Sequence, residues 1–383
     1  MANVWEHPQI IAAEALAHLE DALVITPLCA KDVTSDFTTR ANGWKVGDQI
    51  AFRTHGEYEV KDFNNNIETQ DITTSTRLMK IEKHFDISVE VTAREASLDL
   101  DSFSEQVIRP AAYKLAEAVD SYLGTKILQA FGLYASSNLL GSAADVAQAR
   151  KAAILQQLEP TRYCLVDLDT EATLLGQEWF NQSQTRGKDG ETTLRSGIMG
   201  RVMGMDWYSS ISFPTNSTPH TAGTGTATTN NTPAGANKIG NTTLVIDNGS
   251  GSINQGDRLV IAGCRRPVIA AQSYADLAGV TEIALTDPIT EIIPDNAAVT
   301  VAGSGSDLTY HGAIFDNRSL AVAFPMLDMP EDKVAATVAN NGVSIRVVKG
   351  YDMQTKKTTM SLDLLVGAFA LDPRRITLLA SAA

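Results

Sequence analysis

Apolar and polar residues alternate most regularly between positions 79 and 91 of the chain. The apolar members of this pattern are Met79, Ile81, Phe85, Ile87, Val89 and Val91. Because successive side chains of a strand point to opposite faces, the two-residue period predicts a strand. Together with the segment from Trp44 onward, it predicts an extended β-hairpin over residues 44–92. A two-stranded ribbon is at best marginally stable alone, so we expect Phe85 and Ile87 to contact a neighbouring subunit.

An amphipathic helix is predicted near the start of the chain. The segment PQIIAAEALAHLEDAL, residues 8–23, places apolar side chains on one stripe and has a proline suited to the first turn. Its acidic residues lie off that stripe: Glu14, Glu20 and Asp21. They form either an ordinary solvated face or a docking surface for a partner.

A second, longer helix is predicted after residue 102. Ser102 and Glu105 have the spacing of a capping box, and Pro110 marks a helix start or an interruption. The buried stripe is expected to contain Val107, Ala111, Leu115, Ala118, Val119, Tyr122, Leu123 and Ile127. The part after Pro110 spans roughly 30 Å, which is long enough for a spine.

Helices and strands alternate from residue 143 to residue 214, which predicts an α+β unit. The expected elements are a helix at 143–158, a strand at 162–168 and a helix at 170–180. In the following RSGIMGRVMGMDWYSSISFP, Gly197, Gly200 and Gly204 precede an alternating strand. A phosphate-binding loop needs the opposite order, with a strand before the glycines and a helix after them. The glycines therefore predict a helix-to-strand passage, with Gly204 just past a helix end.

An all-β module is predicted in the second half of the chain. At Thr215 the composition changes to a Thr-, Asn- and Gly-rich segment that predicts a linker. Short strand patterns follow at residues 242–248, 253–263, 267–274, 280–287 and 297–303. This turn-marked spacing is typical of a small β-barrel or sandwich, which we place at residues 223–306.

One segment of this module, NQGDRLVIAG, contains the residues that we expect to shape it. Gly256 and Asp257 predict a turn in which the glycine provides a positive φ. Leu259 and Ile261 follow with a two-residue period, so we expect both side chains to point into the core of the module.

Mixed helix and strand patterns resume after the module. We expect a helix within HGAIFDNRSLAVAFPML, residues 311–327, and strands at 342–352 and 358–371. The chain is therefore predicted to have an α+β fold. Its predicted parts are an N-terminal arm (1–36), an extended hairpin with the long helix (37–140), an α+β domain in two parts (141–222 and 307–339) around the β-module (223–306), and C-terminal strands (340–383).

Composition and charge narrow the classes of function. The chain has 383 residues, 44% of them hydrophobic, and a formal net charge of −14. Nucleic-acid binding relies on Lys and Arg, so a dedicated DNA-binding protein is not expected. The sequence predicts neither a membrane span nor a signal peptide, and we expect the protein to stay in the cytoplasm where it is made. Cys29, Cys164 and Cys264 are widely spaced, which indicates reduced, packed thiols.

The sequence contains no motif for catalysis, for a cofactor or for a metal. The six histidines are dispersed, and each is expected to be a surface or hydrogen-bonded side chain. Asp167, Asp169 and Glu171 could bind a hard cation, but they lack the glycine and the closing glutamate of a calcium loop. A strand end that passes into a helix N-terminus accounts for them better. We therefore expect no enzyme activity, no cofactor and no metal.

The order of the predicted elements resembles the major capsid protein of tailed bacteriophages. The segments that carry the resemblance are VIRPAAYKLAEAVDSYL, RSGIMGRVMGMDWYSSISFP, GDRLVIAG, AIFDNRSLAVAFPML and SIRVVKGYDMQTKKTTMSLDLLVGAFALDPRR. Together they resemble the Hong Kong ninety-seven type fold, and in particular the podovirus branch with an inserted β-domain. In these terms the two-part α+β domain is an axial domain, and the long helix and C-terminal strands belong to a peripheral domain.

The resemblance implies partners and a location. It implies hexamers and pentamers of this chain in an icosahedral head shell, assembled in the host cytoplasm with a scaffolding protein and a portal protein. The mature virion would enclose double-stranded DNA without sequence-specific binding and without a membrane. A basic scaffolding protein would contact the acidic face formed by Glu14, Glu20 and Asp21.

Two other readings of the same sequence stay open. The first is a host-encoded compartment shell of the same fold, which would enclose an enzyme in place of DNA. The second is a bacterial surface or adhesin protein built around the β-module, for which a secretion signal and repeated β-modules would be expected.

Overall fold

The structure is a computed structural model that describes most of the chain. The described residues are 8–31, 40–41, 44–45, 49–53, 76–92, 104–181, 193, 196–214, 220–233, 236–330, 334–354 and 357–382. Residues 1–7 of the expected arm, Ser102 of the expected capping box and the far part of the expected hairpin at 54–75 lie outside them. The chain forms two compact units: unit 1 (residues 1–52, 78–126 and 320–371) and unit 2 (residues 53–77, 127–319 and 372–383).

The helices of unit 1 carry the predicted apolar stripes. α1 (Pro8–Ala22) buries one side, which includes Ile11, Ala15 and Leu19. A π-helical turn (Ser104–Ile108) leads into α4 (Arg109–Ile127). The buried residues of α4 include Ala111, Leu115, Val119, Tyr122, Leu123 and Ile127. Pro110 is the second residue of α4, and it has no N–H to donate to the π-helical turn that precedes it. Both helix predictions are confirmed over the described residues.

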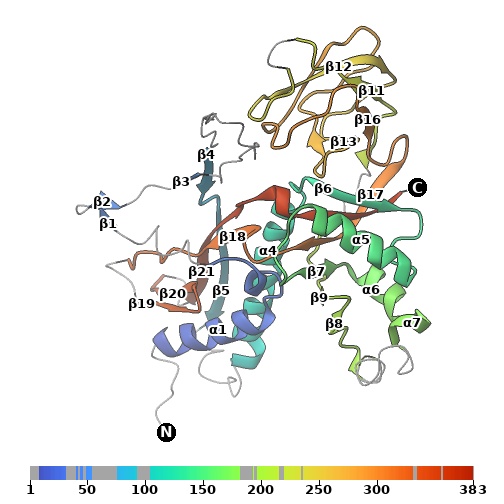
Figure 1. Ribbon diagram of the computed structural model, residues 1–383. Helices are drawn as coiled ribbons and strands as arrows, with labels where there is room; N and C mark the ends of the chain where they lie inside the picture. Colours follow the sequence, from blue (N-terminus) through green and yellow to red (C-terminus); the bar gives the residue numbers. More distant parts are fainter. Residues whose placement is uncertain are drawn as a thin grey trace, which may run out of the picture. The chain divides into compact units, whose positions relative to one another are not determined.

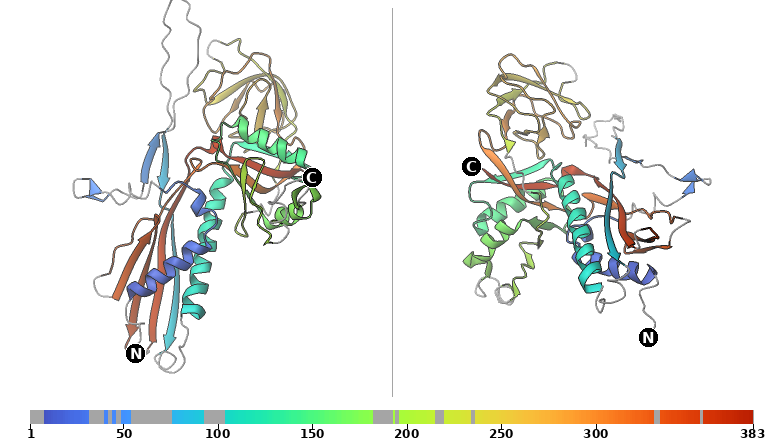
Figure 2. Two further views of the ribbon diagram at one scale, coloured as in Figure 1. Left: turned by 60° about the horizontal axis from the view of Figure 1, so that its bottom comes forward. Right: turned by 180° about the vertical axis from the view of Figure 1, so that it is seen from behind.

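The sheet of unit 1 has five strands (Figure 1). Its order is β18 (Leu320–Ala323), β21 (Lys357–Ala370), β20 (Val343–Asp352) and β19 (Val334–Asn340), with β5 (Lys83–Thr92) paired to β21. The predicted C-terminal strands are confirmed as β20 and β21. α1 contacts β19 and β20, and Figure 2 shows α1 and α4 alongside this sheet. The sheet therefore has one face that the helices can cover.

The position of β5 corrects the prediction of a free two-stranded ribbon. β3 (Gln49–Arg53) and β4 (Thr76–Lys80) form a two-stranded sheet, but β5 continues as a separate strand of the five-stranded sheet. Phe85 is paired with Leu364 and Ile87 with Leu362, and both leucines are buried. The apolar face of β5 thus has partners within unit 1, which removes the original reason for expecting a second subunit there.

Unit 2 contains a seven-stranded sheet. Its order is β6 (Gly132–Ser136), β22 (Thr377–Ala382), β17 (Asp307–Phe315), β7 (Tyr163–Val166), β9 (Met205–Ser209) and β8 (Arg201–Val202), with β10 (His220–Thr221) paired to β17. β22 therefore belongs to unit 2, because it pairs with β6 and β17 and not with the other C-terminal strands.

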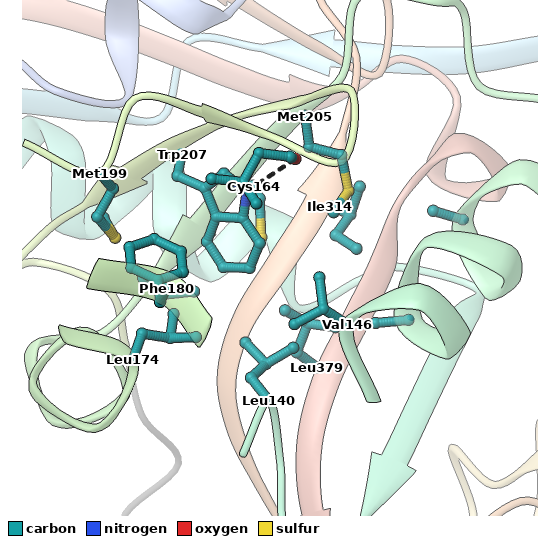
Figure 3. Packing of buried hydrophobic residues seen from close by; sticks show 14 of the residues in the cluster. Leu140, Val146, Cys164, Leu174, Phe180, Met199, Met205, Trp207, Ile314 and Leu379 are labelled. Carbon is teal, nitrogen blue, oxygen red and sulfur yellow. Dashed lines mark hydrogen bonds between the residues drawn. The ribbon is translucent and has the colours of Figure 1, made fainter. Parts of the chain in front are cut away.

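The core of this sheet is built from the predicted α+β elements. α5 (Ala143–Leu155) matches the expected first helix, and β7 and β9 match the expected strands. The single helix expected at 170–180 is instead two helices, α6 (Leu168–Leu175) and α7 (Glu178–Asn181). Val146 of α5 packs in one cluster with Cys164, Phe180 and Trp207 (Figure 3). The indole Nε1 of Trp207 donates to the carbonyl oxygen of Val202 at 3.3 Å. The buried side chains of β9 follow the predicted alternation.

The β-module of unit 2 closes on itself. Its six strands follow the order β14 (Val268–Ile269), β13 (Arg258–Ile261), β16 (Ala298–Val301), β11 (Thr226–Thr229), β12 (Thr243–Ser250) and β15 (Glu282–Ala284). A bridge between Ala270 and Leu285 joins the two ends of this order, so the strands form a small barrel. The five predicted strands are confirmed. The expected linker is wrong in part, because β11 lies inside it and is a central strand.

Two other expectations are corrected. The helix expected at 311–327 does not form, and the segment instead supplies the end of β17 and all of β18. Gly204 does not follow a helix end. Met203 and Gly204, with φ of +51° and +74°, form the two-residue turn between β8 and β9. Such a turn requires positive φ at both central residues, and glycine adopts it without a steric penalty.

Candidate functional site

The predicted turn of the β-module fixes the point where the chain enters the barrel. Asp257 is buried, and its Oδ2 accepts hydrogen bonds from the backbone N–H of Gly223 at 3.0 Å and of Asn254 at 2.7 Å. Its Oδ1 lies 2.7 Å from Nε2 of His220. Gly256 has a φ of +88°, as the turn prediction requires. One carboxylate therefore holds together the turn and the entry segment.

The strand after this turn connects the barrel to the seven-stranded sheet. Leu259 and Ile261 are fully buried, as expected, while Arg258 between the turn and Leu259 is also buried. The guanidinium of Arg258 donates from Nη2 and Nε to the carbonyl oxygen of Ala130, at 2.7 and 3.2 Å. Its Nη1 lies 3.3 Å from the hydroxyl oxygen of Tyr310 in β17. Arg258 is a contact residue that the sequence did not reveal.

In unit 1, Phe85 and Ile87 lie on the apolar side of β5 and are half-buried. The opposite side of the sheet is polar. Asp363 of β21 is buried there, accepts a hydrogen bond from Nε of Arg346 at 3.0 Å, and lies 3.0 Å from Nε2 of His84. The contact of Phe85 and Ile87 with another subunit stays a prediction. Its basis is now their remaining exposure on an edge strand.

The acidic residues of α1 differ in their surroundings. Asp21 is exposed, whereas Glu14 and Glu20 are half-buried. Oε2 of Glu20 accepts a hydrogen bond from Nδ2 of Asn340 at 3.0 Å. Glu20 therefore also helps hold α1 against β19, and the three acids are not equivalent as a docking surface.

A buried carboxylate of α4 anchors the segment after α1. Asp120 accepts hydrogen bonds from the backbone N–H groups of Val24, Ile25 and Thr26 and from the Thr26 hydroxyl, at 2.7 to 3.4 Å. Burial raises the pKa of Asp120, although these hydrogen bonds act in the opposite direction. An acidic residue on the buried side of a predicted helix is the sequence signal that could have identified it.

Three side chains of unit 2 form a hydrogen-bonded series. Nδ1 of His311 lies 2.8 Å from Oδ2 of Asp167, and its Nε2 lies 2.9 Å from Oγ of Ser381. Asp167 also caps α6, where Oδ1 accepts from the N–H of Thr170 at 2.9 Å, as the helix-start interpretation expected. Burial raises the pKa of Asp167, but the hydrogen bonds from His311 and Thr170 outweigh it and lower the pKa overall.

This series has the order of a nucleophilic triad but not its surroundings. Ser381 lies near the end of β22, opposite Thr309 of β17 on one side and Ser136 of β6 on the other. The Ser381 hydroxyl therefore projects from a strand with a neighbour on each side, and not from the sharp exposed turn that presents the nucleophilic serine of an α/β-hydrolase. The geometry supports a structural role that ties α6, β17 and β22 together.

Other reactive groups are few in the part of the chain that the structure describes. Cys29, Cys164 and Cys264 are free thiols, as expected. Burial, and secondarily the charge of Glu291, raises the pKa of Cys264 to about 11, so this thiol stays protonated near neutral pH. Within the described residues, no group of His, Cys, Asp and Glu side chains could hold a metal ion, and no helix is long and apolar enough to span a membrane.

Comparisons by sequence find nothing, whereas comparisons by structure do. No protein-family model and no curated protein matches the sequence. A structure of Mycobacterium phage Che8 matches with 10% identity and a TM-score of 0.52, over 93% of this chain and 90% of that chain. The capsid structure of cyanophage P-SCSP1u matches with 13% identity and a TM-score of 0.46, over 88% and 84% of the two chains. The likeness to the Che8 structure shows a shared fold.

Proposed function

We propose that the chain is a major capsid protein that self-assembles into the icosahedral head shell of a tailed double-stranded DNA bacteriophage. The observation that carries the proposal is the shared fold with the phage Che8 structure. The match covers 93% of this chain, so it includes parts of both units and most of the barrel. The order of sequence segments that resembles tailed-phage coat proteins supports the same function independently.

The charge of the chain supports the enclosure of DNA without tight binding. The net charge of −14 disfavours contacts with phosphates, because such contacts need Lys and Arg to displace counterions. A genome that has to leave the shell benefits from weak contact with its wall. We therefore propose a shell of hexamers and pentamers that packages DNA through a portal protein, and a procapsid that matures as DNA enters.

The acidic residues of α1 are proposed to contact a basic scaffolding protein during assembly in the host cytoplasm. Asp21 is exposed and Glu14 is half-buried, so part of each side chain is accessible to a partner. Glu20 is left unchanged in the test because its carboxylate accepts a hydrogen bond from Asn340 of β19. A Glu14→Lys/Asp21→Lys variant should give fewer scaffold-directed particles, and its remaining assembly should depend less on salt. Asp276→Lys/Glu282→Lys, which reverses two exposed acids of the barrel and changes the net charge by the same amount, is the control for charge alone.

The barrel is proposed to be an inserted domain of the podovirus type that helps the subunit fold and contributes contacts between capsomers. Its closure leaves no long free strand edge, which suits a module that folds by itself. Arg258 connects it to the rest of unit 2 through Ala130 and Tyr310.

Electron microscopy of the chain co-expressed with its genomic neighbours tests the proposed function. Closed shells that contain DNA, or that form with a scaffolding protein and a portal, support a phage head. Closed shells that contain an enzyme support the host-encoded compartment instead. A monodisperse monomer under every condition would contradict both.

A further inference from the structure

Two arginines of the α+β part of unit 2 lie beside the start of β9: a Cβ built on Gly204 would lie 3.7 Å from Nη2 of Arg150, and the N–H of Asp206 donates to the carbonyl oxygen of Arg162 at 2.8 Å. Arg150 is in α5, one helical turn after the buried Val146, and Arg162 directly precedes β7. Both side chains are half-buried. The Nε atom of each is buried and has no hydrogen-bond partner among the described residues. The burial of these two guanidinium groups is therefore only partly compensated by the chain itself.

The charge of Arg150 acts on Arg162. Burial lowers the pKa of Arg162, and the positive charge of Arg150 lowers it further. Nη2 of Arg162 donates to the carbonyl oxygen of Leu158 at 3.4 Å, a long contact with a neutral acceptor. A neutral acceptor offsets a full positive charge less than an anion does.

The carboxylates around this pair are already engaged. Asp316 attracts Arg162, but its Oδ2 accepts hydrogen bonds from Nη1 of Arg375 at 2.8 Å and from the N–H of Glu159 at 3.1 Å. The carboxylate of Asp206 lies 3.7 Å from Nε of Arg201. Neither acid is left to neutralise both Arg150 and Arg162.

The turn between β8 and β9 lies next to the guanidinium of Arg150. Gly204 has a φ of +74°, and a Cβ built at this position would lie 3.7 Å from Nη2 of Arg150. The turn thus approaches the guanidinium to contact distance, and glycine adds no side chain there. Arg150 as a whole is half-buried, so part of its side chain stays accessible to solvent beside this turn.

We propose that Arg150 and Arg162 form an oxyanion-binding site that takes a carboxylate or phosphate group on the Nη atoms of the two guanidinium groups. A planar guanidinium binds such groups through two parallel hydrogen bonds, and the second positive charge strengthens the attraction. The oxyanion comes from inorganic phosphate in solution or from an acidic side chain of a second copy of this chain. With 45 acidic residues, every copy presents carboxylates to its neighbours.

The first arm of the test measures binding of inorganic phosphate to the full chain at constant ionic strength, by calorimetry and by the unfolding temperature. Arg150→Gln and Arg162→Gln should bind phosphate roughly ten-fold or more weakly, as expected from the loss of a charge-assisted pair. Arg265→Gln removes an exposed arginine of the barrel, has the same net charge as the other variants, and should bind like the parent.

The second arm measures self-association of the same four proteins by sedimentation velocity. If the oxyanion is a carboxylate of a second copy, Arg150→Gln should associate more weakly than Arg265→Gln, and phosphate should compete with association of the parent. An effect in either arm supports the site and identifies the source. If Arg150→Gln and Arg265→Gln behave alike in both arms, the proposal is wrong. The phosphate arm does not depend on shell formation, so its result is separate from that of the proposed function.

An apolar variant separates a ligand site from a structural role. Arg150→Met keeps much of the side-chain volume and removes the charge. In chloride alone we expect its unfolding temperature to equal or exceed that of the parent, because an uncompensated, partly buried charge is removed. A clear decrease would mean that Arg150 stabilises the fold itself, and it would overturn the proposal.

Discussion

The five-stranded sheet of unit 1 and the barrel of unit 2 use strands in different ways. The sheet has long strands, and β21 alone spans 14 residues. It separates an apolar side that includes Leu362 and Leu364 from a polar side with Asp363 and Arg346. β5 and β19 lie at its edges. The barrel has short strands, and the bridge between Ala270 and Leu285 closes its order.

Because of this difference, the strand edges of the open sheet are available to partners, whereas those of the barrel are paired with each other. An open sheet leaves backbone groups unpaired along its edge strands, and its two faces can contact different neighbours. A closed barrel uses its strand edges internally, so its contacts with the rest of the chain depend on a few side chains, such as Arg258. We therefore expect unit 1 to respond to substitution mainly in assembly, and the barrel mainly in its own stability.

The largest expected effect is the loss of shells on substitution at the β5 edge. Phe85→Asp puts a charge at a half-buried apolar position, so closed shells should not form. Because Phe85 is paired with the buried Leu364, this variant should also lower the stability of unit 1. Electron microscopy and urea denaturation measure the two effects.

Phe85→Ala distinguishes these two effects, because it removes the ring without adding a charge. If Phe85→Ala lowers the stability of unit 1 and still forms shells like the parent, the ring serves the core of unit 1 only. The expected contact with a second subunit would then be wrong.

The second effect concerns the core of the barrel. Leu259→Ala should lower the stability of the barrel by about 2 to 5 kcal/mol, because it removes buried atoms and leaves a cavity. The segment 223–306 expressed alone should unfold cooperatively, and the variant should unfold at lower urea concentration. Val260→Ala, at an exposed position of the same strand, is the matched control. An isolated segment without dispersed NMR signals would show that the barrel needs the rest of unit 2.

The third effect concerns the point of entry into the barrel. Asp257→Asn replaces one carboxylate oxygen by an NH₂ group, and the one remaining oxygen cannot accept both from Gly223 and Asn254 on one side and from His220 on the other. A buried donor left without an acceptor costs about 1 to 3 kcal/mol, so we expect a loss of this size. Asp295→Asn, at an exposed turn of the barrel, should change stability much less. Equal stability of Asp257→Asn and the parent in urea denaturation would contradict the proposal that the Asp257 carboxylate stabilises the entry into the barrel.

The burial of the two faces of a strand explains which strands could be predicted from the sequence. β9, β20 and β21 were predictable because one face of each is more buried than the other, which produces a visible two-residue period. The end of β17 and all of β18 are buried on both faces, so their continuous apolar run does not distinguish a strand from a helix. The wrong helix at 311–327 follows from this ambiguity.

The missed strand β11 has a different cause. Its residues are mostly threonines, which a composition-based reading assigns to a linker. In the structure the Thr229 hydroxyl is satisfied, because it donates to the carbonyl oxygen of Pro294 at 2.6 Å and accepts from the N–H of Ala297 at 2.9 Å. Threonine also favours strands through its β-branched side chain, so polarity alone was a poor guide.

Whether a contact of the candidate sites could be predicted depends on how many residues separate the two partners in the sequence. Asp167 was assigned to a helix start because its partner Thr170 is three residues away. The partners of the same carboxylate and of Asp120 lie 144 and 94 residues away, at His311 and Thr26. A single sequence contains no signal for such pairs, because they depend on how distant strands and helices meet.

The smallest expected effect is a difference in how the two units respond to acid. The pKa of Asp167 in unit 2 is lowered, because the hydrogen bonds from His311 and Thr170 outweigh burial. Its carboxylate stabilises the folded state above the unfolded pKa of about 3.9, and this stabilisation is lost as the pH falls through the lower, folded value. The pKa of Asp120 in unit 1 is raised by burial, so the folded state binds the proton more tightly than the unfolded state. Unit 1 should therefore gain stability from this group as the pH falls from the folded value towards about 3.9.

Hydrogen exchange of peptides from α1 and from β17, compared at several acidic pH values after correction for intrinsic rates, measures the two units separately. Asp167→Asn should flatten the pH dependence in β17 and leave α1 unchanged, because only the group with the lowered pKa is removed. Asp120→Asn should remove the gain in α1 and leave β17 unchanged. Both variants also lose acceptor capacity, so the comparison uses the slope with pH and not the absolute stability. Parallel slopes for the two peptides in the parent protein would mean that other carboxylates dominate the acid response of both units.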